Sequence, residues 1–392
     1  MGVSNSWFGP WSFWLWEPPS QASLWQRVAA RRAAPTFSWF VLSNTRSVYP
    51  GMISAIPLIL ACLVFAQAQS TPLRIPDNIQ TLLDAHQYIQ AEQAVQSELE
   101  QSPNWETGHL LLAQIYSATG RYDLAERSAL AAIRRRESLD GFMLLALATM
   151  RLQKLNESIE WLDKAALREP DNPEIYKLLG LDYALGGMLK ESEKAFRHAT
   201  ELGPKNWELN YLHGRALYEL ELLPDSQKSL QHAIELNPSS TRSWTALGQV
   251  QEKLRNLSSA EDSYRKALEL CRSQTSECAW PLLQLGFLTE RQKGAKEAES
   301  YFRQAVAARP DWAKPHFYRG KALAALDDLS GARAEMETAV RLDEQKSQYH
   351  YQLAQVYRRL GKSEKAKEHM KRYQTLADRE HQHQAPVELS NP

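Results

Sequence analysis

The chain has 392 residues, with 46 basic and 46 acidic side chains, so its formal net charge at pH 7 is zero. Glycine is scarce at 17 residues and 23% of the residues are charged, a composition typical of a soluble helical protein and unfavourable for a β-rich one. Nucleic-acid-binding proteins concentrate Lys and Arg to neutralise phosphates. No such excess occurs here, so nucleic acid is not expected as a partner.

Residues 1–51 contain six of the 12 tryptophans, without a helical or strand periodicity. One interpretation is a membrane-seeking segment, because Trp favours the headgroup region of a bilayer. We favour the other interpretation, in which this Trp-rich leader is not translated. It therefore takes no part in the predicted fold.

Residues 52–68 have the pattern of an export signal peptide. The apolar run from residue 52 to residue 66 is short for a membrane-spanning helix but suits the apolar part of a signal peptide. It ends in Ala66, Gln67 and Ala68, the small-residue pattern that signal peptidase accepts, which predicts cleavage after Ala68. The expected location is exported, either periplasmic or secreted. The alternative is a membrane anchor, if the segment stays uncleaved.

From residue 72 onward, one pattern of small and large residues returns with a period of 34. Its best copy, residues 173–206, carries Tyr176, Leu179, Gly180, Tyr183, Gly187, Phe196, Ala199 and Pro204. In that copy these residues occupy positions 4, 7, 8, 11, 15, 24, 27 and 32. The pattern resembles the tetratricopeptide repeat family, whose unit is two antiparallel helices joined by a tight turn.

The resemblance extends over residues 72–380, with an exported bacterial type of this family as the expectation. Nine units follow one another: 72–105, 106–138, 139–172, 173–206, 207–240, 241–278, 279–312, 313–346 and 347–380. A single unit cannot bury its own apolar face, so the units must stack. The resemblance thus implies an all-α fold, a right-handed α-solenoid of about nine helix-turn-helix repeats.

Several residues mark where the helices start and end. Asp171, followed by Pro173 and Glu174, predicts an acidic helix cap. Ser258 with Glu261 predicts a capping box. Three glycines stand at position 15 of their repeats, where the first helix must end and the chain reverse, a role that suits a residue tolerant of positive φ: Gly120, Gly187 and Gly361.

After the sixth unit the spacing grows by four residues over the period of 34, and this longer connection is bounded by Cys271 and Cys278. In an exported protein the two cysteines could close a small disulfide loop. The alternative is two unpaired thiols, and the sequence leaves both open. Two cysteines lack the further ligands of a structural zinc site, so zinc is not expected.

The chain after the repeats, residues 381–392, is a polar tail. The second helix of the last unit is therefore expected to cap the array. His369, His381 and His383 lie near this end, but no carboxylate or cysteine accompanies them at matching helical spacing, so no metal site is predicted.

No enzyme signature is found: the sequence has no Gly-rich phosphate loop, no GxSxG and no HExxH motif. The repeats also leave no room for a catalytic domain. We therefore expect a non-enzymatic protein without cofactors.

The resemblance implies that the first helix of each unit lines a concave groove and exposes positions 2, 5, 9, 12 and 13. We expect about half of the large side chains at these positions to be exposed and the rest to pack against the next unit. The predicted partner-binding residues are Met143, Leu147, Lys177, Tyr211, Arg215, Tyr218, Arg242, Phe287, Phe317, Lys321, Tyr351 and Arg358. Tyr, Phe and Arg are frequent anchors of protein interfaces.

The predicted function is a scaffold or assembly factor that binds a peptide or helix of a protein partner in the groove, with Arg and Lys selecting an acidic partner. One alternative is a glycan-binding or carbohydrate-active envelope protein, although the groove positions show no pair of carboxylates for hydrolysis. A second is a nucleic-acid solenoid that reads one base per repeat. The sequence does not specify the partner or the oligomeric state.

Overall fold

The computed structural model describes residues 75–271 and 276–382 of the chain. Within these ranges the regular structure consists of 18 α-helices and one short 3-10 helix, which confirms the all-α prediction. None of the helices described is both long enough and apolar enough to cross a membrane. The Trp-rich leader, the signal segment 52–68 with its cleavage residue Ala68, and most of the polar tail lie outside the described residues.

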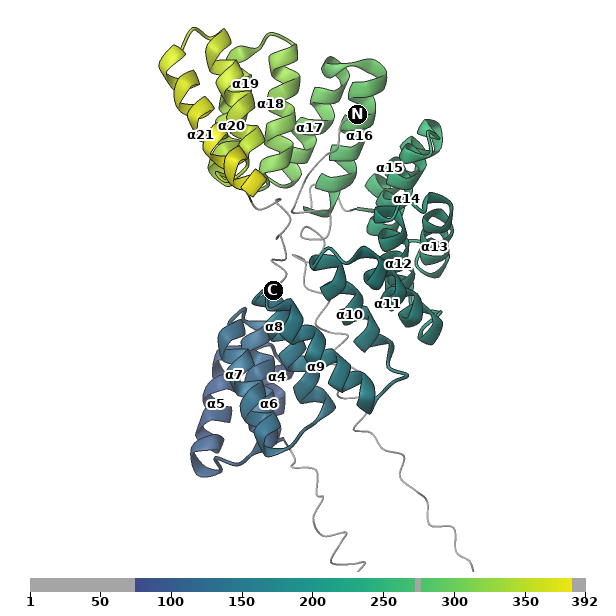
Figure 1. The fold of residues 1–392 in the computed structure, drawn as a ribbon, viewed down its shortest axis with the longest axis vertical. Helices are drawn as coiled ribbons and strands as arrows, with labels where there is room; N and C mark the ends of the chain where they lie inside the picture. The colour runs from purple at the N-terminus through teal and green to yellow at the C-terminus, as the bar shows by residue number, and fades with distance from the viewer. Residues whose placement is uncertain (1–74, 272–275, 383–392) are drawn as a thin grey trace, which may run out of the picture. The chain divides into compact units, whose positions relative to one another are not determined.

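The chain divides into two compact units, and each is described by itself. The first, residues 1–202, contains four antiparallel helix pairs in its described part (Figure 1). They are α4 (Asp77–Asp84) with α5 (Tyr88–Gln101), α6 (Glu106–Ala118) with α7 (Tyr122–Arg135), α8 (Leu139–Arg151) with α9 (Leu155–Arg168), and α10 (Pro173–Leu185) with α11 (Leu189–Leu202).

The second unit, residues 203–392, contains five such pairs in its described part. They are α12 (Trp207–Glu219) with α13 (Leu223–Leu236), α14 (Thr241–Lys253) with α15 (Leu257–Leu270), α16 (Ala279–Lys293) with α17 (Ala295–Ala308), α18 (Ala313–Ala325) with α19 (Leu329–Leu342), and α20 (Ser347–Arg359) with α21 (Ser363–Gln382). The short helix η1 (Ser276–Cys278) precedes α16.

Each predicted 34-residue range holds one helix pair, and the final helix runs on beyond the last range. The helix α21 has 20 residues, against 14 in α19 and in the other second helices before it. It therefore continues past residue 380 into the start of the predicted tail. Leu376, near its end, is buried, so this longer helix covers apolar surface of the last repeat.

The helix starts differ in detail from the sequence prediction. The cap of α10 is Asn172 rather than Asp171: its side-chain oxygen accepts a hydrogen bond from the backbone N–H of Glu174 at 3.1 Å. Pro173 takes the first helical position, as predicted. The capping box at Ser258 is wrong, because α15 already begins at Leu257 and the residue before it, Asn256, makes no side-chain capping bond. Polar residues thus mark helix starts only to within one or two residues.

The turns inside the repeats all need a residue with positive φ. Gly120, Gly187 and Gly361 have φ angles of 74°, 74° and 73°, which confirms their predicted role. In five other repeats the same position is held by a residue with a side chain, namely His86, Gln153, Glu221, Arg255 and Asp327, with φ between 56° and 67°. Repeat seven departs from the rule, since its positive φ falls on Gly294, one residue later. The turn geometry is therefore a property of the repeat and not of glycine.

In most repeats the two helices pack closely because position 8 is small and position 24 is large. A Cβ atom built on Gly180 would lie 2.6 Å from a ring carbon of Phe196, and one on Gly248 would lie 2.5 Å from a ring carbon of Tyr264. Both aromatic side chains are fully buried. A larger residue at position 8 would therefore force the helices of that repeat apart.

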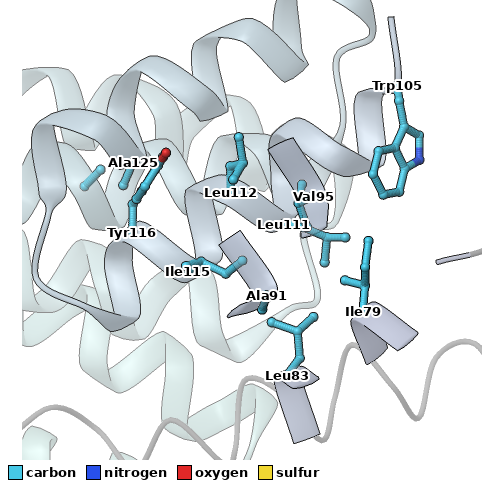
Figure 2. Packing of buried hydrophobic residues seen from close by; sticks show 11 residues of the cluster. Ile79, Leu83, Ala91, Val95, Trp105, Leu111, Leu112, Ile115, Tyr116 and Ala125 are labelled. Atoms are coloured by element: carbon cyan, nitrogen blue, oxygen red, sulfur yellow. The ribbon is translucent and has the colours of Figure 1, made fainter. Parts of the chain in front are cut away.

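Neighbouring repeats share their apolar cores. Figure 2 shows the first such core, in which side chains of α4, α5 and α6 come together with Ala125 of α7. Ile79, Ala91, Val95 and Ile115 are all fully buried there. A core built across repeats explains why the units must stack.

Two recurring polar contacts were not predicted from the sequence. In three repeats a buried serine of the second helix donates a hydrogen bond to the carbonyl oxygen of position 8: Ser158 to Ala146, Ser192 to Gly180 and Ser226 to Gly214, at 2.8, 2.8 and 2.6 Å. The side chain at position 4 bonds to the carbonyl oxygen six residues earlier in five repeats: His109, Asn210, Trp244, His316 and His350. Each contact satisfies a backbone carbonyl near a helix end or at a close helix contact.

Candidate partner-binding surface

The positions predicted to line a groove all fall on the first helices of the pairs, from α8 to α20. Within each unit, we call the surface formed by these first helices the first-helix face. Of the twelve predicted residues, Tyr351 and Arg358 are exposed, and six are half-buried: Met143, Leu147, Tyr218, Arg242, Phe287 and Lys321. The remaining four, Lys177, Tyr211, Arg215 and Phe317, are buried with exposures of 3% or less.

The contacts of the buried residues show why they offer little surface. Phe317 packs against the rings of Tyr318 and Tyr349, with centroids 5.1 and 4.6 Å away, so its role is in the core between repeats. The amine of Lys177 lies 2.6 Å from a carboxylate oxygen of Glu174, one turn away on the same helix. These two side chains belong to packing and ion pairing within the array.

Arg215 ties two consecutive repeats together. Its guanidinium donates a hydrogen bond of 2.7 Å to the side-chain oxygen of Gln249, 34 residues further along the chain, and forms an ion pair with Glu219 at 3.3 Å. It also lies beside the ring of Tyr218, which Lys253 approaches at 4.3 Å from the ring centroid. Burial raises the pKa of Tyr218 to about 12, so this hydroxyl stays protonated at physiological pH.

In the second unit, aromatic and cationic side chains of α16, of α18 and of the residue that directly precedes α18 gather into one group. We name it the aromatic-cationic cluster; its members are Trp280, Phe287, Trp312, Lys314, Tyr318 and Lys321. The rings of Trp280 and Trp312 stack with centroids 5.3 Å apart, and Phe287 meets Tyr318 edge to face at 4.4 Å. Offset-stacked and edge-to-face pairs are the favourable arrangements of aromatic rings, so these contacts hold the cluster in a defined shape.

Lys314 stands within this cluster. Its amine lies 5.1 Å from the ring centroid of Trp280 and 6.0 Å from that of Phe287, at cation–π distance. Burial, with a smaller contribution from the positive charge of Lys346, lowers the pKa of Lys314 to about 8. Lys321 lies in the same way over the ring of Tyr318, 5.2 Å from its centroid.

Phe287 and Lys321 were predicted from the sequence as partner-binding residues, whereas Trp280 and Lys314 were not. Both missed residues stand at position 2 of their repeats, one of the positions that the groove rule includes. The signal was therefore present, since position 2 carries Arg242, Trp280 and Lys314 in three consecutive repeats.

In the described ranges, no group of three or more His, Cys, Asp or Glu side chains is placed to hold a metal ion. His369, one of the histidines considered for a metal, lies instead against His350 with the two Nδ1 atoms 3.0 Å apart. Burial lowers the pKa of His369, and the neighbouring His350 lowers it further. His383 and the side chain of His381 lie outside the described residues.

Cys271 and Cys278 are close enough to be bridged. Their Cα atoms lie 5.6 Å apart, within the range of disulfides, and the structure joins their sulfur atoms. Both are buried and pack with Leu282 and Ala305 in one small core between repeats six and seven. The arrangement fits the bridged alternative, which chemical analysis of the protein has to test.

Comparison with solved structures finds similar helical arrays. The chain resembles yeast Tom70 with a TM-score of 0.55 and 17% identity, over 71% of this chain and 58% of that one. It resembles the APC/C hetero-tetramer Cut9–Hcn1 with a TM-score of 0.50 and 16% identity, over 74% of this chain and 56% of that one. The chain thus spans somewhat more than half the length of each, and identities this low show the fold alone.

No curated protein sequence matches the chain. Sequence models of the tetratricopeptide repeat family match residues 110–173, 211–275 and 290–347, and a further model of the same family matches residues 347–379. Together the matched segments cover more than half of the chain, and the described part of each segment consists of the helix pairs set out above. The chain therefore belongs to the tetratricopeptide repeat family.

Proposed function

We propose that this protein is a non-enzymatic scaffold or assembly factor that binds a peptide or helix of a partner protein on its first-helix face. The observation that carries the proposal is the run of accessible aromatic and cationic side chains on α16, α18 and α20. Phe287, Lys321, Tyr351 and Arg358 lie on three consecutive first helices and are half-buried or exposed. Aromatic residues and Arg are the anchors of many protein interfaces, and tetratricopeptide proteins typically serve as interaction scaffolds.

The alternatives have less support. The fold and the family offer nothing that favours the glycan-binding reading. A nucleic-acid solenoid would need a continuous track of cations, whereas many Lys and Arg side chains of this nearly neutral chain are engaged in ion pairs with carboxylates. A protein or peptide partner is the better candidate.

We also propose an exported location, with the partner in the same compartment. The support is the signal-peptide pattern of residues 52–68 together with the close approach of Cys271 and Cys278. Disulfides persist in oxidising compartments, so both observations favour export. The retained membrane anchor is the alternative, and the intact mass described in the Discussion tests it.

A site-specific photo-crosslinker tests the binding surface. With p-benzoylphenylalanine at Tyr351, which is 37% exposed on α20, we expect one defined crosslinked partner in the native cells. The matched control places the same group at Leu342, which is 38% exposed on the second helix α19. The same products from both positions, or no product from Tyr351, would contradict the proposal.

Substitution gives a second readout. The double variant Tyr351→Ala and Arg358→Ala removes accessible anchors without touching the core, and partner capture is expected to fall at least about tenfold. Alanine at Tyr211 or Phe317 is unsuitable, because both are buried and their loss would disturb packing.

A further inference from the structure

The amine of Lys314 has no carboxylate within ion-pair distance among the described residues, although it is half-buried. Arg319, on the same helix, shows the contrast: it pairs with Glu299 at 3.0 Å and with Glu335 at 2.6 Å. Removing an amine from water without an anionic partner is unfavourable, and cation–π contacts with Trp280 and Phe287 offset only part of that cost.

The charges around Lys314 make an anion more favourable still. After burial, the group that most affects the pKa of Lys314 is Lys346, which carries a charge of the same sign. The amine therefore stands in a positive local environment beside apolar rings.

We propose that the aromatic-cationic cluster binds an acidic peptide segment of the partner, with a side-chain carboxylate of that segment paired to Lys314 and its apolar side chains against Phe287 and Tyr318. The inference rests on the proposed function and adds the chemistry of the partner segment. Lys321, seven residues further along α18 and over the ring of Tyr318, supplies a second cation for a following carboxylate.

The composition of the cluster favours a peptide over other anions. The rings of Phe287 and Tyr318 and the stacked indoles of Trp280 and Trp312 lie beside the two lysines. Aromatic rings pack well against aliphatic side chains, and a half-buried amine beside them gives a charge-assisted bond that is stronger than one in water. A segment that alternates Glu with Leu presents both features at once.

Fluorescence anisotropy on the full chain tests the proposal. The probes are a fluorescein-labelled decapeptide of alternating Glu and Leu and the same peptide with Gln for every Glu. The protein variants are Lys314→Gln and, as the matched control, Lys296→Gln, an exposed lysine on α17 outside the cluster. We expect the acidic probe to bind and Lys314→Gln to weaken it about tenfold or more, while Lys296→Gln has no effect.

Chemical labelling of the unmodified protein gives an independent readout. Lysine acetylation by N-hydroxysuccinimide acetate at pH 8 is mapped by peptide mass spectrometry, with the exposed Lys296 as the reference position. A deprotonated amine is the nucleophile, and the lowered pKa of Lys314 gives it a larger fraction of that form. The acidic probe is expected to protect Lys314, and the Gln probe is not.

Several outcomes would overturn the inference. Equal binding of the Glu and Gln probes, equal effects of the two lysine substitutions, or Lys314-dependent binding of a 20-nucleotide single strand in preference to the acidic probe would each do so. Thermal unfolding checks that Lys314→Gln is folded. Crosslinking from Tyr351 in the protein with Lys314 intact separates the two proposals: a trapped partner without binding of the acidic probe overturns only this inference, and probe binding without a trapped partner overturns only the proposed function.

Discussion

Asp182 is the residue whose environment is least expected in this array. It lies on α10, is fully buried, and neither carboxylate oxygen has a hydrogen-bond partner among the described residues. The nearby hydroxyl of Ser158 lowers its pKa a little but donates its proton to the carbonyl oxygen of Ala146. Burial dominates and raises the pKa of Asp182 to about 7. The folded protein therefore holds a neutral acid below pH 7 and a buried anion above it.

This shift predicts that Asp182 makes the first unit less stable as the pH rises. The unfolded chain ionises the group near pH 4 and the folded protein only near pH 7, so its contribution to the free energy of unfolding falls across that window and is level above it. Asp182→Asn keeps the shape and removes the charge. We expect it to raise the free energy of unfolding by roughly 2–4 kcal/mol more at pH 8 than at pH 4.

Chemical denaturation at the two pH values measures the difference. The matched control is Asp171→Asn, since Asp171 is exposed, and it should change stability by little at either pH. A gain for Asp182→Asn that does not depend on pH would show that the buried group does not titrate in this window.

At the scale of the element, the turn between the two helices of a repeat keeps its backbone conformation although the residue at its centre differs from repeat to repeat. In eight of the nine repeats the residue at position 15 has a positive φ, yet only three of those eight residues are glycine. The backbone N–H of the next residue bonds to the carbonyl five residues earlier, as Lys154 does to Thr149 and Met188 to Tyr183. This bond closes the end of the first helix and sets the reversal of the chain.

A side chain at this position costs stability, because Cβ approaches the following carbonyl in the left-handed conformation. Gln153 has a φ of 62° and its side chain is exposed, so Gln153→Gly is expected to raise the free energy of unfolding by about 0.5–1 kcal/mol. The converse change, Gly187→Ala, should lower it by about 1 kcal/mol.

Urea denaturation of the three proteins checks these signs. Gln153→Ala serves as the control, because it shortens the side chain but keeps the Cβ atom, and it should give no such gain. If Gln153→Gly destabilised the protein, the turn would be held by something other than its local φ preference.

At the scale of the whole molecule, the two units differ in how their repeats are joined. Repeats six and seven of the second unit are connected by a longer segment whose ends are Cys271 and Cys278, buried beside Leu282 and Ala305. A bridge there would close a short loop at this junction between two helix pairs. Its presence depends on the compartment in which the protein folds.

The intact mass of the protein from its native cells, before and after reduction and alkylation, tests both export and the bridge between Cys271 and Cys278. We expect the mass of residues 69–392, with two cysteines protected until reduction. Reduction should then lower the free energy of unfolding of the second unit by about 2–3 kcal/mol. The double variant Cys271→Ser and Cys278→Ser should be insensitive to the reductant. A mass that retains the leader, with both thiols free, would contradict export and withdraw the bridge.

The sequence by itself determined the repeat register, the nine helix pairs of the described chain and the glycine turns. These features follow from local rules: small residues stand where helices touch, and positive φ recurs where the chain reverses. Helix starts were predicted less accurately. The cap of α10 is Asn172 and not the predicted Asp171, because neighbouring polar residues compete for the same capping position.

Only the tertiary structure decided which side chains of the first-helix face are accessible and which are paired. Arg215 and Phe317 occupy groove positions in the repeat, yet contacts to the next repeat bury them. Lys314 and Asp182 look like ordinary surface charges in the sequence, yet Lys314 is half-buried and Asp182 is fully buried, and neither has an opposite charge at ion-pair distance among the described residues. The physical reason is that burial and ion pairing depend on residues about 34 positions apart, and their distance is set by how one helix pair packs against the next.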